Sequence, residues 1–503
     1  MSLAIKMYSI SDFIPRRYQE EILNTAVSNN TLVVLPTGTG KTKIAILTAV
    51  ARLNNHKVSN ILAVSPTKPL SAQIQREFIE STNIPKDKIV LLTGALNPKK
   101  RQELWESAVV IIATPQTIQK DLENERISLK ATSLLIIDEC HRSRENFANT
   151  KVANFYIKES KFPRILALTA SPGGNKKKID EIAKNLYIDS FEIRTEEDIE
   201  EFIQKKEIKN LEVILPEEMK SLHSKLKKVY SAKLNELKKI GFTKPSQFIS
   251  KKDLLLLQQK LRNNVNKNPA AYYGMSLTAL LIKLDYAIEL LETQGLEPLQ
   301  EFLEKLSKEE TKAAKTLLKM PEIQSSMELT KELIKNKIKH PKVYMLKGII
   351  RKDIEKNPLA KIIVFANYRN TIDSLLAELN SLENVNAVKL IGQKSGLSQK
   401  EQISVIKDFE QGKFNVLICS QIGEEGMDIK GATTAVMYDQ GSSSEIRKIQ
   451  RAGRVGRLEA GNIISLLTKD TRETGYYWAS KRKENLMKNT LKTLQEKQTK
   501  LSS

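Results

Sequence analysis

The sequence predicts an α/β protein in which two parallel-sheet domains follow one another and an all-α helical domain is inserted between them. Two stretches, one before about residue 200 and one after about residue 341, alternate short Val-, Ile- and Leu-rich runs with amphipathic segments. Such runs, bounded by Gly, Pro or Ser, are typical of strands buried on both faces of a parallel sheet with right-handed crossovers. Between the two stretches these runs nearly vanish, and Leu, Lys, Glu and Gln recur at helical spacing,.

The first sheet domain is expected over residues 1–200 and the second over residues 341–480. Because both alternate in the same way, we expect two similar α/β units in tandem. The strand-like runs of the first domain are Thr31–Leu35, Ile61–Ser65, Val109–Ala113, Leu134–Asp138 and Ile165–Thr169. Those of the second are Lys361–Ala366, Ala387–Ile391, Asn415–Ser420, Thr434–Tyr438 and Asn462–Leu466.

Residues 201–340 are expected to form a helical insert with its own core, because apolar residues such as Leu222, Leu226 and Val229 recur at helical spacing,. From Lys220 to Lys267 there are 13 basic and 2 acidic residues. A solvated helix face explains part of this excess, and a surface that contacts phosphates explains it better. Residues 481–503 are expected to form a basic helical tail.

Composition narrows the class of protein. The 503 residues suggest about three domains, and 40% hydrophobic with 28% charged residues argue against disorder,. No apolar run is long enough for a bilayer and no signal peptide is recognisable, so we expect no membrane association and a cytoplasmic protein, nucleoid-associated in a prokaryote. The net charge of +22 favours a nucleic-acid partner,. A Lys-rich solvated surface remains the alternative.

A phosphate-binding loop follows the first predicted strand. The sequence Pro36-Thr37-Gly38-Thr39-Gly40-Lys41-Thr42 leads directly into a helical pattern. Loop N–H groups and a helix N-terminus can hold phosphates, Lys41 can reach the β- and γ-oxygens, and the Thr42 hydroxyl can bind Mg²⁺. The general pattern has Gly where this chain has Leu35,. The sequence therefore predicts ATP and Mg²⁺ as cofactors.

An acidic box follows the fourth predicted strand, in the sequence Asp138-Glu139-Cys140-His141. Because an apolar strand delivers these carboxylates to the ligand-binding edge of an α/β sheet, Asp138 is predicted to hold Mg²⁺ and Glu139 to orient the attacking water. The alternative is that Asp138 and Glu139 are two acidic residues at an ordinary strand–loop junction, with no role in catalysis. Cys140 is interpreted as a small packing residue rather than a nucleophile.

A third motif lies in the second domain, where Gln450, Arg454 and Arg457 belong to the segment QRAGRVGR. Arginines supplied from another domain can stabilise charge on the γ-phosphate, with effects of about 10³–10⁵ in rate. They would also couple hydrolysis to separation of the two domains, since ATP would then contact both domains at once. The alternative is that these residues are ordinary surface residues of a basic helix, with no role at the ATP site.

In this order, the motifs resemble those of superfamily 2 helicases of the DExH branch, over roughly two-thirds of the chain. The resemblance implies two RecA-like P-loop domains and assigns further roles. Gln19 would contact the adenine base with Arg16 or Arg17 assisting, and Asp428 would belong to the ATP site. His141 with Thr169, Ala170 and Ser171 (motif III) would couple hydrolysis to movement. The implied nucleic-acid contacts are Thr67, Lys68, Gln73, Thr93, Gly94, Thr114, Arg369, Gly423 and Glu425.

Within the superfamily the chain is most similar to the archaeal Hef and Fanconi-anaemia M-type helicases, on the stretches Leu35–Thr42 and Glu424–Ile429 and on its basic insert. This implies ATP-dependent remodelling of forked and branched DNA in repair. No nuclease motif is recognisable, so no strand cleavage is expected. Two alternatives stay open: an RNA helicase or duplex-RNA translocase, and an ATP-switched scaffold for repair partners, whose identity the sequence does not indicate.

Overall fold

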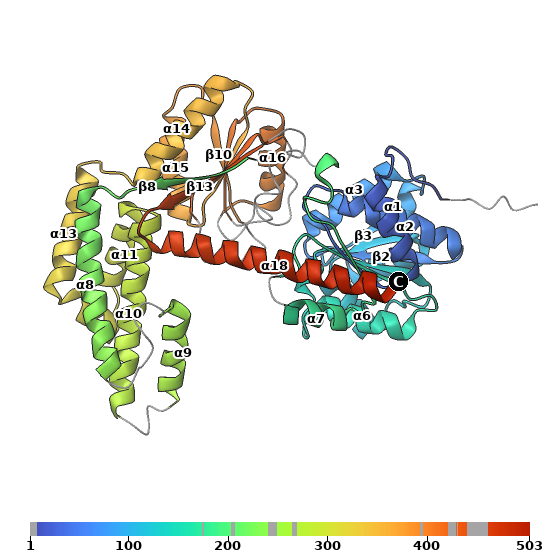
Figure 1. Cartoon of the computed structure of the whole chain (residues 1–503), viewed down its shortest axis with the longest axis horizontal. Coiled ribbons are helices and arrows are strands. Elements are labelled where there is room, and N and C mark those ends of the chain that lie inside the picture. The colour runs from blue at the N-terminus through green and yellow to red at the C-terminus, as the bar shows by residue number, and fades with distance from the viewer. Residues whose placement is uncertain are drawn as a thin grey trace, which may run out of the picture.

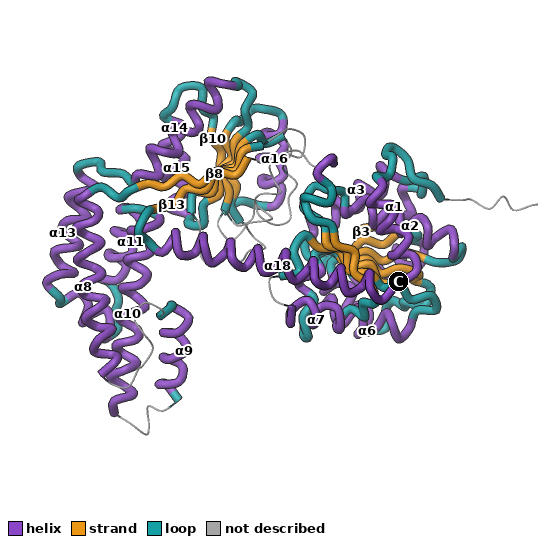
Figure 2. Tube along the Cα trace, in the orientation of Figure 1, coloured by secondary structure: helices purple, strands orange, loops and turns teal. Residues whose placement is uncertain are grey.

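The computed structural model describes residues 8–173, 176–202, 207–239, 249–263, 269–392, 396–420, 429, 431–439 and 461–502. Two sheet domains and a helical bundle are distinct bodies (Figures 1 and 2). Both sheets are parallel and a helical bundle lies next to the second, so the predicted fold class is confirmed. No helix in the described ranges is long and apolar enough to cross a membrane.

The first sheet has the strand order β3-β4-β2-β5-β6-β1-β7. All five predicted runs of this domain are strands, whereas the edge strands β3 and β7 were not predicted. The sequence of β7, Ser-Phe-Glu-Ile, has two partly buried positions and makes no apolar run, whereas β3 is an apolar run as short as β1 and β4 that was not assigned as a strand. The strands are β1 (Thr31–Val34), β2 (Asn60–Val64), β3 (Ile89–Leu92), β4 (Val110–Ala113), β5 (Thr132–Ile137), β6 (Ile165–Thr169) and β7 (Ser190–Ile193).

Helices cover both faces of this sheet (Figure 1). Successive strand residues point to opposite faces, so Leu32 and Val34 lie in one core cluster while Val33 and Leu35 lie in the other,. The helices are α1 (Arg17–Ser28), α2 (Lys41–Asn55), α3 (Lys68–Ser81), α4 (Pro98–Ser107), α5 (Pro115–Glu123), α6 (Ala148–Glu159) and α7 (Lys176–Asn185), with short 3₁₀ turns η1 (Lys86–Lys88), η2 (Cys140–Arg142) and η3 (Glu200–Phe202).

The second sheet has the order β10-β11-β9-β12-β13-β8. Its five predicted runs are the strands β9 (Ile362–Phe365), β10 (Ala387–Leu390), β11 (Val416–Cys419), β12 (Thr434–Met437) and β13 (Asn462–Thr468). Helices α14 (Pro341–Lys356), α15 (Arg369–Asn380) and α16 (Gln399–Glu410) pack on it.

The sixth strand, β8 (Glu207–Val213), lies within the residues expected to belong to the helical insert. It pairs in parallel with β13 along its whole length. Its first four residues are exposed, and it carries Glu207, Lys209, Asn210 and Glu212, so it has no apolar run to recognise. The chain thus leaves the first domain, adds an edge strand to the second sheet and only then enters the helical insert.

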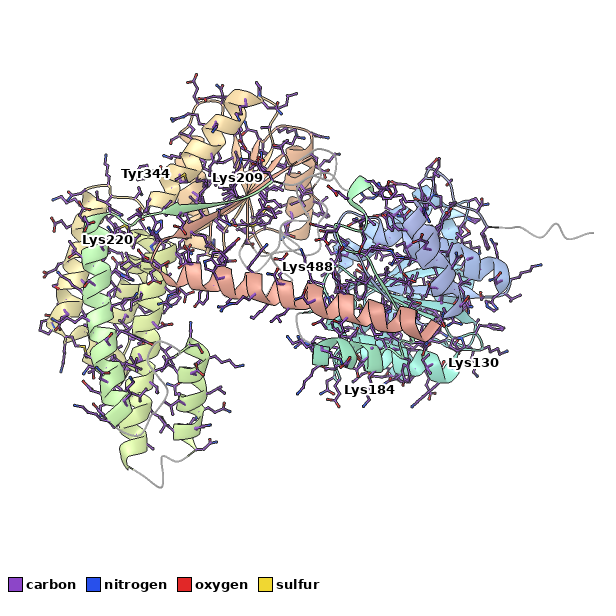
Figure 3. All side chains as sticks on the ribbon, in the orientation of Figure 1. Lys130, Lys184, Lys209, Lys220, Tyr344 and Lys488 are labelled. Atoms are coloured by element: carbon purple, nitrogen blue, oxygen red, sulfur yellow. The ribbon has the colours of Figure 1, made fainter. Side chains whose placement is uncertain are left out.

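The insert is a bundle of α8 (Glu217–Lys239), α9 (Lys251–Arg262), α10 (Pro269–Thr293), α11 (Leu296–Ser307), α12 (Lys312–Leu318) and α13 (Pro321–Lys335). Leu222, Leu226 and Val229 are buried in its core, as their spacing predicted. Lysines remain on the surface of all three bodies, from Lys130 and Lys184 on the first domain to Lys220 on the insert (Figure 3).

A buried ionic junction joins the insert to the second domain. Glu292 of α10 is hydrogen-bonded to His223 at 2.6 Å and to Arg472 at 2.7 Å. Burial opposes its ionisation, but the bonds from His223 and Arg472 lower the pKa of Glu292 to about 2. Beside it, the Lys342 ammonium lies 2.5 Å from a Glu473 carboxylate oxygen, and both side chains are fully buried. The Glu292–Arg472 contact holds the insert to the second domain, and the Lys342–Glu473 pair fixes the start of α18 beside it.

One long helix, α18 (Arg472–Ser502), begins at this junction and crosses to the first domain (Figure 1). The expected tail 481–503 is the later part of this helix, and Met487 lies in a core cluster of the first domain. Trp105 is buried in that cluster, whereas Trp478 of α18 is 60% exposed and contacts Tyr477 edge-on.

Candidate ATP site

The phosphate loop lies between β1 and α2, where the sequence placed it. Gly38 and Gly40 have φ angles of +81° and +84°, which favour glycine,. The Thr39 hydroxyl donates to the Pro36 carbonyl at 2.7 Å. The Lys41 ammonium donates to the carbonyls of Leu35 and Pro36 at 3.1 and 3.2 Å. The ammonium therefore lies over the loop, at the N-terminus of α2, where phosphate oxygens are favoured.

Helix α1 packs against this loop. A Cβ atom on Gly40 would lie 2.5 Å from the Gln19 side-chain nitrogen. Gln19 is almost fully buried, and its side-chain oxygen accepts the backbone N–H of Arg16 at 3.0 Å. The Tyr18 hydroxyl donates to the Thr39 carbonyl at 2.5 Å. The structure thus brings Gln19 to the loop, while the Arg17 side chain is 89% exposed and pairs with Glu21.

Replacing Gly40 by Ala should weaken ATP binding by about 5- to 30-fold, because the left-handed backbone costs roughly 1–2 kcal/mol in any residue with a Cβ. The collision with Gln19 adds to that cost. The KM for ATP and nucleotide titrations measure the effect. Gly348→Ala is the matched control, since a Cβ there meets nothing within 4 Å. Equal KM values for the two variants would contradict this role of Gly40.

The acidic box follows β5, as predicted. The Asp138 N–H donates to the Val64 carbonyl at 2.9 Å, and the Ser65 hydroxyl donates to its carboxylate at 3.3 Å. Burial raises the pKa of Asp138 to about 7, the negative charge of Glu139 adds to the shift, and the Lys41 ammonium opposes it. The charge of the phosphate-loop lysine is therefore felt at the acidic box. No sequence signal assigned a role to Ser65, which lies next to Asp138 only because β2 and β5 are neighbours.

Glu139 begins a chain of polar contacts. Its backbone is left-handed, with φ of +50°, an uncommon conformation for a residue with a side chain,. Burial opposes its ionisation, but the bond and charge of His141 and the Lys41 ammonium hold the pKa of Glu139 below its usual value. His141 Nδ1 lies 3.2 Å from the Glu139 carboxylate and 3.3 Å from the Thr169 hydroxyl. The Ser171 N–H donates to that hydroxyl at 3.1 Å. The acidic box and motif III are therefore in direct contact.

Cys140 lies inside the first-domain core between these polar residues. Burial raises the pKa of its thiol well above the usual value. A thiol kept protonated is a poor nucleophile, which supports the packing interpretation.

The candidate nucleic-acid residues of the first domain follow three neighbouring strands. Thr67 follows β2 and caps α3, Thr93 and Gly94 follow β3, and Thr114 follows β4 and precedes α5. Because these strands are adjacent and parallel, their carboxyl ends meet at one edge of the sheet. Lys68 is exposed there, whereas the Gln73 amide donates to Glu77 at 3.1 Å.

In the second domain, Arg369 begins α15 and its side chain is 62% exposed. It lines a pocket together with Tyr368 and the insert residues Tyr286 and Phe302. The remaining candidates lie outside the residues that the structure describes: Gly423, Glu425, Asp428, Gln450, Arg454 and Arg457. Their roles stay predictions.

Family models match most of the chain. The model described as DEAD/DEAH box helicase matches residues 16–182, and the helicase conserved C-terminal domain matches residues 341–459. A third, described as putative ATP-dependent RNA helicase, helical bundle, matches residues 217–340. The three models correspond to the two sheet domains and the insert.

Relatives and a solved structure agree with these models. The crystal structure of the Pyrococcus furiosus Hef helicase domain is similar with 38% identity and a TM-score of 0.74, covering 93% of this chain and 98% of that one. A putative ATP-dependent RNA helicase of Methanocaldococcus jannaschii is 35% identical over 95% of this chain and 61% of its own length. An ATP-dependent DNA helicase of Schizosaccharomyces pombe is 32% identical over 91% of this chain and 57% of its own length. The chain thus spans less than two-thirds of the length of each of these two curated relatives.

Proposed function

Because the chain belongs to the DEAD/DEAH-box helicase family of the Hef and Fanconi-anaemia M type, we propose that it is an ATP-dependent DNA helicase or translocase that remodels forked and branched DNA. The observation that carries the proposal is that the phosphate loop and the acidic box follow neighbouring parts of the first sheet, where the Lys41 ammonium acts electrostatically on Asp138 and Glu139 and where Glu139 is linked through His141 to motif III. The Schizosaccharomyces pombe relative is named a DNA helicase. Remodelling of DNA would place the protein at the nucleoid of a prokaryotic cell.

In this proposal Mg²⁺ would be held by Asp138 and Thr42. Both offer the hard oxygen ligands that Mg²⁺ prefers, and the buried Asp138 carboxylate has a raised pKa that a nearby cation would lower,. The ion would neutralise charge on the β- and γ-phosphates. Lys41 would bind the same phosphates, and Glu139, kept ionised by His141, would orient and polarise the attacking water,.

The second domain would complete the site with Gln450, Arg454 and Arg457, so that ATP draws the two sheet domains together and hydrolysis releases them. Nucleic acid would lie along the edge formed after β2, β3 and β4, where hydroxyl and backbone groups contact phosphates without reading bases. The basic helices α8 and α9 of the insert would contact the branch,.

The proposal is tested by ATP hydrolysis measured without nucleic acid and with single-stranded, duplex, forked and four-way DNA of matched length. Forked or four-way DNA should raise kcat several-fold, and more than duplex DNA does. Hydrolysis no faster with forked DNA than without nucleic acid would contradict the proposal.

RNA is the second candidate substrate, because the model that matches the insert and the Methanocaldococcus jannaschii relative are both named for RNA helicases. Backbone contacts of this kind do not by themselves distinguish the two sugars. Competition between forked DNA and an RNA fork of the same sequence decides between them. Stronger competition by RNA would reverse the assignment.

A further inference from the structure

Helix α18 is anchored at its first turn in the junction between the insert and the second domain. Arg472 binds Glu292 of α10 at 2.7 Å and Asp285 of the same helix at 3.2 Å. Glu473 is buried against Lys342 of α14. The start of α18 must therefore follow any movement of the insert and the second domain as a unit.

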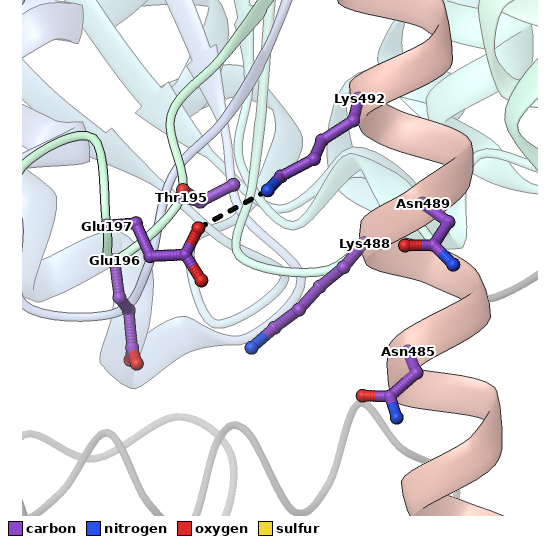
Figure 4. A pocket seen from close by; sticks show the side chains of 7 residues that line it. All are labelled: Thr195, Glu196, Glu197, Asn485, Lys488, Asn489 and Lys492. Atoms are coloured by element: carbon purple, nitrogen blue, oxygen red, sulfur yellow. Dashed lines mark hydrogen bonds and ion pairs between the residues drawn. The ribbon is translucent and has the colours of Figure 1, made fainter.

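The far part of α18 is docked on the first domain. Met487 is 4% exposed and packs within the core cluster on one face of the first sheet. The Ser171 hydroxyl donates to the Met487 sulfur at 3.0 Å. Lys492 pairs with Glu197 at 3.3 Å across a cleft of about 340 Å³ between α18 and residues 195–197 (Figure 4). The helix thus contacts motif III from outside the nucleotide site.

Between these ends, α18 exposes several side chains, although Ser480 is only 7% exposed. Arg482 and Lys483 are exposed, and Leu486 is 58% exposed. A continuous helix of 31 residues is roughly 45 Å long and transmits displacement between its ends, because each turn is held by backbone hydrogen bonds,. Figure 1 shows it as a bar between the two sheet domains.

We propose that α18 is a strut that couples the position of the insert to motif III, and through it to Glu139. A displacement of Met487 moves Ser171, whose N–H is bonded to Thr169, and the Thr169 hydroxyl meets His141 beside Glu139. The inference rests on the proposed function, in which the insert engages DNA. It adds a connection between the sheet domains that does not pass through ATP.

The strut is tested by the double variant Arg482→Gly/Lys483→Gly, with Arg482→Ala/Lys483→Ala as the matched control. Both remove the same two charges, but two interior glycines disfavour the helix by roughly tenfold or more relative to two alanines. Basal ATPase in both variants should change much less than the DNA-stimulated rate of the glycine pair, since neither side chain belongs to the nucleotide site. The glycine pair should lose most of the stimulation by forked DNA, and the alanine pair should keep it. Equal losses in the two would overturn the strut and indicate that the charges contact DNA.

A second readout needs no nucleic acid. Amide hydrogen exchange in residues 169–171 should be faster in the glycine pair than in the alanine pair, because Met487 then holds Ser171 less firmly. Equal exchange rates in the two variants would overturn the strut. A wild-type protein that DNA does not stimulate, with exchange that differs between the variants as expected, would instead contradict only the proposed function.

Discussion

Replacement of Lys41 by Ala is expected to lower kcat for ATP hydrolysis by at least about 10²–10³, the usual effect of removing one positioned charge-stabilising donor. The ammonium would bind the phosphates, and it also opposes the raised pKa of Asp138. Its removal therefore raises that pKa further and leaves more Asp138 protonated near neutral pH. Steady-state ATPase assays measure the loss, and fluorescence anisotropy should show that DNA binding is largely retained.

Lys43→Ala is the matched control for this experiment. Lys43 lies on the same helix, but its ammonium donates to the Ser81 hydroxyl and lies over the Phe13 ring. The control removes the same charge from α2 without removing a phosphate contact, so its kcat should stay near the wild-type value. An active Lys41→Ala variant, or equal losses in the two, would refute the assignment of the phosphate site.

Replacement of Lys342 by Met is expected to destabilise the second domain by about 3–5 kcal/mol, because it leaves the Glu473 carboxylate buried without its cation,. The double variant Lys342→Met/Glu473→Met should recover most of the loss, since replacing both buried charges by apolar groups of similar volume is often neutral. Urea titrations followed by the fluorescence of Trp478, in a Trp105→Phe background, report the unfolding of this region.

Lys347→Met provides the comparison on the same helix. Lys347 pairs with Glu378, but the two side chains are 23% and 24% exposed, so solvent screens the interaction. Its loss should cost no more than about 1 kcal/mol. If the Lys342 variant were no less stable than the Lys347 variant, the buried pair would not hold the junction.

The sequence alone determined the parts of the protein whose signal is local. The strands β1, β2, β4, β5 and β6 are continuous apolar runs, since a central parallel strand is buried on both faces,. The phosphate loop and the acidic box are each one unbroken stretch of sequence, because one strand and the turn after it supply all the residues of each motif. For that reason Lys41 and Asp138 could be proposed as site residues without a structure, and in the structure the positive charge of Lys41 opposes the raised pKa of Asp138.

Only the tertiary structure decided which distant residues meet. The polar strand β8 becomes a strand by pairing with β13, and nothing in its own composition predicts that. Ser65 reaches Asp138 because β2 lies beside β5, and Gln19 reaches Gly40 because α1 packs on the loop. The basic tail likewise proved to be the end of α18, whose Met487 packs beside Ser171, more than three hundred residues earlier. Such contacts depend on how separate elements pack together, and the spacing of residues within one element carries no information about them.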